Sequence, residues 1–153
     1  NVQGCTALKK LISYKNKLTS LDVSNLTKLE GLECYENKLD SLNAQGCTAL
    51  KELDCHTNEL TSLNVQDCTA LLRLNCTENK LNAQAMTALL NALPTRQSSY
   101  AVYAILYTEE TGKVEGNHKD FTNPPELKAA FDGAKSRKWN LNKIIAGGSE
   151  EDI

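Results

Sequence analysis

Apolar and polar residues follow a pattern that recurs every 21 positions along the first half of the chain. Copies of the pattern begin at Cys5, Leu26, Cys47 and Cys68. Leucines recur in register at positions 8, 29, 50 and 71, at 11, 32, 53 and 74, and at 18, 39, 60 and 81. A unit of this length cannot bury so many leucines alone, so successive copies must stack on one another. The pattern therefore predicts a repeat architecture over residues 1–81.

Within each copy, apolar residues alternate with polar ones along a short segment, as at Leu53 and Cys55, and this alternation indicates a strand. The fourth copy has the spacing LxxLxCxxNxL, from Leu71 to Leu81, after a CTAL opening. This pattern resembles the leucine-rich repeat family, in particular its bacterial secreted and surface-attached members, over residues 5–81. The resemblance implies an α/β solenoid, a right-handed superhelix with short parallel strands on its concave face and extended return segments such as LTSL.

An asparagine also recurs in every copy, at Asn16, Asn37, Asn58 and Asn79. The tight turns of a stacked repeat bury backbone groups that need hydrogen-bond partners. We therefore interpret the asparagines as structural, and the resemblance implies that each side chain bonds the backbone of adjacent turns.

The six cysteines fall into two columns of the predicted stack. The first column contains Cys34, Cys55 and Cys76, and the second contains Cys5, Cys47 and Cys68. Ser13 takes a place in the first column and Leu26 in the second, which a packing position tolerates but a metal ligand or a disulfide does not. Parallel side chains on neighbouring strands also hold their Cβ atoms too far apart for an unstrained disulfide. Buried free thiols are the favoured interpretation, with a disulfide and a metal site as weaker alternatives, and we expect all six to react only after denaturation.

The repeat pattern ends at residue 82, and the rest of the chain predicts a cap of the form β-α-β-α-β, counted from the strand at 71–77. A helix is expected from an N-cap at Asn82 to Pro94, and a strand at 100–107. A second helix is expected to begin at an Asn123 cap with Glu126 three residues later, followed by a strand at 139–145. The expected buried face of this second helix consists of Leu127, Ala130, Phe131 and Ala134.

Two crossover connections would add both strands to the parallel sheet of the repeats. We therefore expect residues 82–146 to continue the solenoid as a cap. Residues 147–153 are Gly-rich and acidic, and we expect them to form a flexible tail.

Outward-facing strand positions form the candidate ligand-binding strip. Tyr14, Tyr35, His56 and Thr77 share one outward column, beside the acids Glu33 and Asp54. The strip also includes Lys10, Glu52 and Arg73. Amphipathic rings with charged neighbours are typical of a protein-binding hot spot. The alternative is that the rings only pack across neighbouring strands.

Charge and motifs exclude several other functions. The chain has 17 basic and 19 acidic residues, so its charge would not attract nucleic acid. No apolar run reaches the length of a membrane span, so no membrane insertion is expected. His56 and His118 have no cysteine or carboxylate at metal-ligand spacing, and the pair Glu109 and Glu110 has no predicted pocket. We therefore expect a non-enzymatic protein that uses no cofactor and no metal.

Two functions remain open. The favoured one is a protein recognition or adhesion module whose partner is a protein ligand, host extracellular proteins included. The alternative is a carbohydrate-binding or spacer module of an exported protein, in which Tyr14 and Tyr35 stack on sugar rings. The resemblance implies an extracellular or cell-surface location, although the N-terminus has no signal-peptide pattern. Because the chain starts within a repeat, we expect it to be a fragment of a longer protein.

Overall fold

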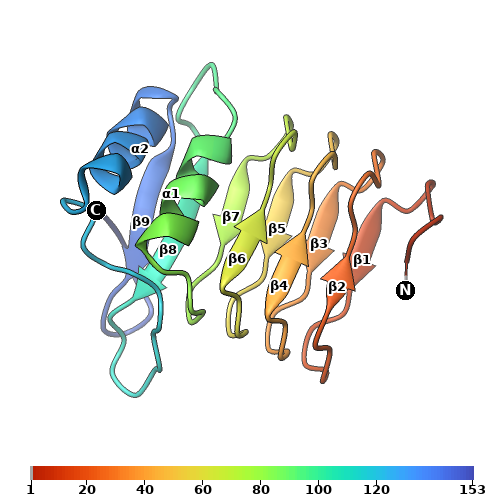
Figure 1. Cartoon of the computed structure of the whole chain (residues 1–153), viewed down its shortest axis with the longest axis horizontal. Coiled ribbons are helices and arrows are strands. Elements are labelled where there is room, and N and C mark those ends of the chain that lie inside the picture. The colour runs from red at the N-terminus through yellow and green to blue at the C-terminus, as the bar shows by residue number, and fades with distance from the viewer. Residues whose placement is uncertain (1) are drawn as a thin grey trace.

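The computed structural model describes residues 2–153, which form a mostly sheet α/β fold with ten short strands and two helices (Figure 1). One sheet has seven strands and is called the large sheet: β1 (Lys10–Ile12), β3 (Gly31–Glu33), β5 (Glu52–Asp54), β7 (Arg73–Asn75), β8 (Tyr103–Thr108), β9 (Asn140–Ile144) and β10 (Glu150–Asp152). The other, the small sheet, has three: β2 (Leu21–Asp22), β4 (Ser41–Asn43) and β6 (Ser62–Asn64). The helices are α1 (Ala83–Ala92) and α2 (Pro125–Ser136).

The 21-residue period of the sequence is also the register of both sheets. Leu32 pairs with Leu53 and Leu53 with Leu74 in parallel strands of the large sheet. In the small sheet, Leu42 pairs with Leu63, also in parallel. Each of the first three repeats thus contributes one strand to each sheet, which confirms the predicted short parallel strands.

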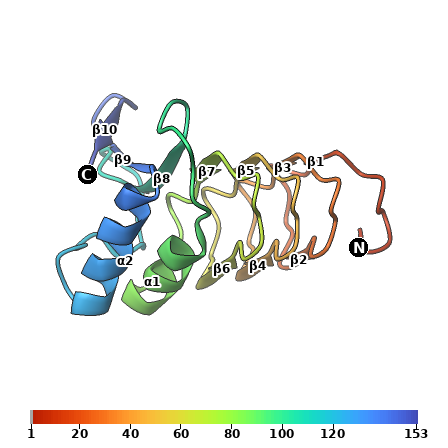
Figure 2. The same cartoon turned by 90° about the horizontal axis from the view of Figure 1, so that it is seen from above.

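The core lies between the two layers of the fold. The large sheet forms one layer, and the small sheet with α1 and α2 forms the other (Figure 2). The recurring leucines from the second repeat onward are almost completely buried between them, as Leu29, Leu50 and Leu71 show. Burial of each leucine removes its side chain from water and stabilises the fold by roughly 1.5–3 kcal/mol. This repeated contribution holds the repeats together.

Helix α1 confirms the expectation from its sequence. The Asn82 side chain accepts a hydrogen bond from the backbone N–H of Ala85 at 2.9 Å, as an N-cap does. At the other end, the guanidinium group of Arg137 donates to the carbonyl oxygens of Leu90 and Leu93 at 2.6 and 3.1 Å. The Leu90 carbonyl also accepts the N–H of the C-cap residue Leu93 at 3.3 Å, so Arg137 adds to the hydrogen bonds that close the C-terminus.

Helix α2 differs from the expectation at its first residue. The N-cap is Pro124 and not Asn123, and no side chain caps the helix. The physical reason lies in the sequence Pro124-Pro125, because a residue that precedes proline is pushed into extended backbone. Pro124 has a ψ of 167°, so the helix begins one residue later than predicted. The buried face of α2, from Leu127 to Ala134, is the predicted one.

The C-terminal residues also differ from the expectation of a flexible tail. Glu150–Asp152 form β10, which pairs with β9 in antiparallel orientation. Gly147 and Gly148 have φ angles of 86° and 77°, which allow the tight turn between the two strands. The Ile153 N–H donates to the Leu141 carbonyl at 2.8 Å. The glycines thus signal a hairpin turn at the free edge of β9.

Candidate functional site

The large sheet has one face against the core and one face that no helix or other sheet of residues 2–153 covers (Figure 2). We call the uncovered one the outer face. Because side chains alternate along a strand, the leucines at the centre of β3, β5 and β7 point inward and their neighbours point outward. The outer face therefore carries the side chains that were predicted to form the candidate ligand-binding strip.

Three rings on this face stack into one column, which we call the aromatic column. The ring centroids of Tyr14 and Tyr35 lie 4.5 Å apart with an angle of 8° between the planes. Those of Tyr35 and His56 also lie 4.5 Å apart, at 12°. Both faces of the Tyr35 ring are thus covered, and desolvation raises the pKa of its hydroxyl. Cross-strand packing, the alternative interpretation of this strip, is present in the structure.

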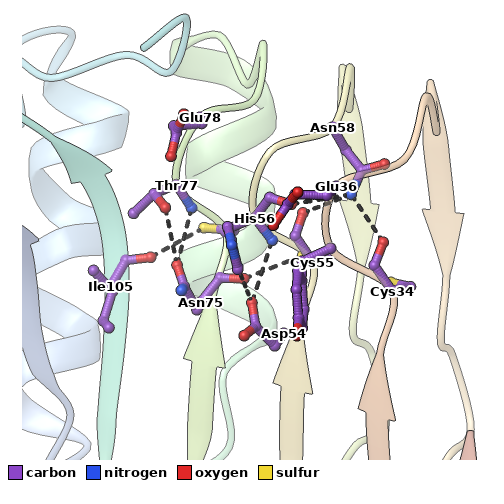
Figure 3. A network of polar contacts seen from close by, with 12 residues as sticks. Cys34, Glu36, Asp54, Cys55, His56, Asn58, Asn75, Thr77, Glu78 and Ile105 are labelled. Atoms are coloured by element: carbon purple, nitrogen blue, oxygen red, sulfur yellow. Dashed lines mark hydrogen bonds and ion pairs between the residues drawn. The ribbon is translucent and has the colours of Figure 1, made fainter. Parts of the chain in front are cut away.

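The column ends at Thr77, which the sequence placed among the outward residues but which is only 1% exposed. The Thr77 hydroxyl and N–H both donate to the Asn75 side-chain oxygen, at 3.1 and 3.3 Å (Figure 3). One repeat earlier, the His56 ring lies 2.6 Å from the Asp54 carboxylate in the same arrangement. Thr77 is too short to extend the ring stack and bonds back to its own strand, so it does not belong to the strip.

The charged residues of the strip are paired with one another across neighbouring repeats. The Lys10 ammonium lies 2.7 Å from the Glu33 carboxylate, and this hydrogen bond raises the pKa of Lys10. Arg73 pairs with Glu52 in the same way. These pairs are partly exposed, so each contributes at most about 1 kcal/mol to stability. All eight candidate residues therefore lie on one face, and each carboxylate among them has a cationic neighbour or a histidine.

The charged residues surround a shallow depression of about 270 Å³ in the outer face. At Gly31, which has no side chain, the Lys10 side chain lies over the strand, 3.6 Å from the position that a Cβ atom would take. Tyr103 and Ile105 of β8 also line it, and the sequence analysis did not include them. They are in register with Arg73 and Asn75, so extending the outward columns into the segment YAVYAILY would have found them.

The asparagine column has the structural role that was predicted. The Asn58 amide group donates to the carbonyl oxygens of Cys34, Cys55 and His56, at 3.0–3.2 Å, and its oxygen accepts from the Leu39 N–H at 3.0 Å (Figure 3). Asn37 and Asn79 make the equivalent bonds in their own repeats. Asn16 is exposed and donates to the carbonyl oxygens of Ser13 and Tyr14 in its own turn.

A fifth asparagine, which the sequence analysis missed, continues this column from outside the repeats. Asn117 donates to the carbonyls of Cys76 and Leu106, both at 2.8 Å, and accepts from the Leu81 N–H at 2.9 Å. Beside it, the Glu115 carboxylate accepts a hydrogen bond from the N–H of Glu78 at 2.9 Å. In the earlier repeats, the N–H at this position donates instead to a backbone carbonyl of the next turn. The loop after β8 thus supplies the hydrogen bonds of a further turn. Its sequence signal is the tripeptide GNH at 116–118, which resembles the ENK of the repeats at 36–38 and 78–80.

The cysteines are free thiols, and five of the six are buried. Cys5 is exposed, so the expectation of six buried thiols is wrong at this position. Within residues 2–153, Cys5 lies in the first repeat and has a neighbouring repeat on one side only. Cys47 and Cys68 lie in the same column, and their thiols lie 3.1 Å from the carbonyls of Val23 and Ala44. Burial raises the pKa of Cys34 and of Cys68 to about 12, so these thiols are not reactive at neutral pH.

Residues 2–153 contain no group of three or more His, Cys, Asp or Glu side chains placed to hold a metal ion. The ring of His118 lies 2.8 Å from the Asp120 carbonyl, far along the chain from the aromatic column. In the same part of the chain, neither helix has the length and apolarity to cross a membrane.

Comparison with known proteins gives no match among protein-family models, curated proteins or solved structures.

Proposed function

We propose that this chain is a leucine-rich repeat solenoid that acts as a non-enzymatic module for protein recognition or adhesion. The repeat assignment is supported by the 21-residue register of both sheets and by the asparagine column that joins successive turns. In such a solenoid, the outer face of the large sheet corresponds to the concave face on which the sequence analysis placed the ligand.

The observation that carries the functional proposal is the uncovered outer face. A parallel sheet is ordinarily covered on both faces, because its strands connect through elements that pack against it. Here one face instead presents the edges of two tyrosines, the exposed side chain of Ile12 (55%), and several ion pairs. Mixed aromatic and charged surfaces of this kind are typical of protein interfaces.

A protein partner fits this face better than a glycan. Sugars bind tyrosine by stacking on the face of its ring, and both faces of Tyr35 are occupied by Tyr14 and His56. Tyr14 stacks on Tyr35 with one face of its ring and is 38% exposed. An isolated half-exposed ring is a small platform for a sugar, whereas ring edges and flanking charges remain available to protein side chains. The extracellular or cell-surface location remains a proposal based on the family resemblance.

The experiment compares two charge reversals that are matched in their surroundings. Arg73 pairs with Glu52 on the outer face, and Lys80 pairs with Glu59 outside it; both cations are about half exposed. Candidate extracellular proteins would be screened against the chain, and the affinity of a binder measured for R73E and K80E. We expect R73E to weaken binding about tenfold and K80E to leave it unchanged.

A glycan panel run in parallel decides between the two functions. We expect no glycan response, because the aromatic column is stacked on itself. A glycan that binds the chain and is lost when Tyr14 and Tyr35 are both changed to alanine would overturn the proposal in favour of carbohydrate binding.

A further inference from the structure

The segment that joins α1 to β8 carries an almost fully exposed tyrosine. Tyr100 is 90% exposed, whereas Tyr14 of the aromatic column is 38% exposed and its ring is stacked on Tyr35. Aromatic side chains ordinarily contribute to stability by burying much of their area against the protein. Tyr100 contributes little in this way, so packing within residues 2–153 does not explain its position. We call residues 95–101 the Tyr100 loop.

Tyr100 occupies the second position of a β-turn that runs from Ser99 to Val102. The N–H of Val102 donates to the Ser99 carbonyl at 3.2 Å, which closes the turn. The third position is Ala101, which has a φ of 56°. Glycine or asparagine is ordinarily found at such a position, because a Cβ atom makes the left-handed conformation unfavourable. Strained backbone of this kind persists where surrounding contacts hold it, and it is concentrated at functional sites.

The contacts that hold the turn come mainly from β9. The Asn140 side-chain amide donates to the carbonyl oxygens of Ser99 and Val102, at 2.8 and 2.9 Å, and so joins the first and last residues of the turn. The Ser98 hydroxyl accepts the N–H of Tyr100 at 3.1 Å. Val102 itself is buried in the core. The Tyr100 ring is therefore presented on a preorganised support, which lowers the entropy that a partner must remove on binding.

The Tyr100 loop borders the outer face of the large sheet. It rises beyond this sheet on the side away from the small sheet (Figure 2). Tyr103, which lines the depression, follows Tyr100 by three positions, so their Cα atoms lie within about 11 Å of each other. A protein interface of ordinary size takes about 800 Å² from each partner. One partner of this size covers both the depression and the loop.

The composition of the loop also suits contact with a protein. Residues 97–100 read Gln-Ser-Ser-Tyr. The one charged residue of the loop, Arg96, is turned toward the repeats, where its guanidinium group donates to the carbonyl oxygens of Thr69 and Leu71. The binding loops of antibodies are rich in tyrosine and serine, because tyrosine supplies a large contact area at a low cost in side-chain entropy. The surface that suits this loop is an apolar patch with polar groups around it.

We propose that the Tyr100 loop is a second contact element of the protein interface on the outer face, and that Tyr100 is its anchor residue. The inference rests on the proposed function, because the outer face supplies the other contacts. The partner packs apolar side chains against the Tyr100 ring, and its neighbouring surface meets the charged residues of the depression. Tyr14 and Tyr35 offer mainly ring edges, since their rings stack on each other, whereas Tyr100 offers its whole ring.

The test uses the whole chain and a phage-displayed library of random dodecapeptides. Peptides that bind the chain and lose affinity for R73E are those that occupy the outer face. Their affinity is then measured for Y100A and for the control V114A, which removes an apolar side chain that is 86% exposed beyond the opposite end of β8. We expect Y100A to weaken binding about tenfold and V114A to leave it unchanged. Both variants should keep the melting temperature of the unchanged chain, because neither side chain packs in the core.

A further variant separates the ring of Tyr100 from its hydroxyl group. Y100F keeps the ring, so we expect its affinity to remain within about twofold of the unchanged chain. Peptides that need Arg73 but bind Y100A as tightly as the unchanged chain, or that lose as much affinity for V114A, would overturn this inference and leave the proposed function standing. If no selected peptide depends on Arg73, both are overturned.

Two other occupants of the Tyr100 loop are distinguished by separate measurements. A dimer of the chain that sedimentation detects and that Y100A disrupts would identify a second copy as the occupant. A glycan that binds the chain and is lost in Y100A would identify a sugar. Either result would overturn the assignment of the loop to a protein partner.

Discussion

At the scale of single residues, one asparagine side chain joins the turns of two repeats. Asn58 satisfies four backbone groups, in the turns of its own repeat and the one before, and three of these hydrogen bonds are buried. We predict that N58A lowers the free energy of unfolding by about 3 kcal/mol, because buried backbone groups lose their partners. The equivalent change N16A removes two bonds of an exposed turn and should cost less than about 1 kcal/mol. Urea denaturation measures both, and equal effects would contradict the assigned roles.

The buried thiols make stability depend on pH in the alkaline range. The pKa of Cys34 and of Cys68 is raised by burial from 9.0 to about 12. Above pH 9 the unfolded chain therefore loses thiol protons that the folded chain keeps. The contribution of these thiols is fully present below pH 9 and is lost as the pH rises toward 12, by about 1.4 kcal/mol per pH unit for each thiol.

We predict a lower free energy of unfolding at about pH 10 than at about pH 8, and a smaller difference when Cys34 and Cys68 are both changed to alanine. A thiol reagent at neutral pH should modify one cysteine of the native chain, Cys5, and all six after denaturation. Rapid modification of a second thiol in the native chain would show that the five buried cysteines are more accessible than the structure indicates.

At the scale of elements, the sequence was sufficient wherever periodicity and caps agreed. The strands of the repeats follow from leucine alternation, and α1 follows from Asn82 and Pro94. It was insufficient where a contact between distant segments decides the conformation. The hairpin of β9 and β10 depends on a free sheet edge, and the turn-like loop at Asn117 depends on the end of the fourth repeat. Neither has a periodic pattern of its own.

The same limits apply to the candidate strip. The sequence placed its eight residues on one face, because the 21-residue register fixes which side chains are neighbours. It did not show that the Tyr35 ring is covered on both faces or that Thr77 is buried, since both depend on side-chain conformation.

The loop that supplies Asn117 gives a prediction at this scale. A Cβ atom on Gly116 would lie 2.4 Å from the backbone carbonyl oxygen of Asn79, which is closer than such atoms approach. We predict that G116A displaces the loop and lowers the free energy of unfolding by about 2 kcal/mol, as overpacked sites do. Gly31 is a suitable control, because its added Cβ would meet only the Lys10 side chain, at an ordinary contact distance of 3.6 Å. A fully stable G116A would show that the loop does not dock on Asn79.

At the scale of the whole molecule, the proposed solenoid predicts an elongated shape. Each repeat packs on its two neighbours, so the chain extends in one direction as repeats are added. In both sheets, successive strands follow one another along the longest axis of the molecule, from the N-terminal repeat toward the helices (Figure 1). A compact domain of 153 residues has a radius of gyration of about 15 Å. An elongated stack of the same mass must have a larger one.

We therefore predict a radius of gyration clearly above about 15 Å for the monomer in solution, measured by small-angle X-ray scattering on a chromatographically separated peak. The measurement on a separated monomer matters, because self-association would also raise the value. N58A provides an internal comparison: if the asparagine column holds the turns together, its loss lets neighbouring repeats separate, and the radius increases before global unfolding in mild urea. A monomer of about 15 Å would mean that the repeats fold onto one another, and the outer face would then not be free to bind a partner.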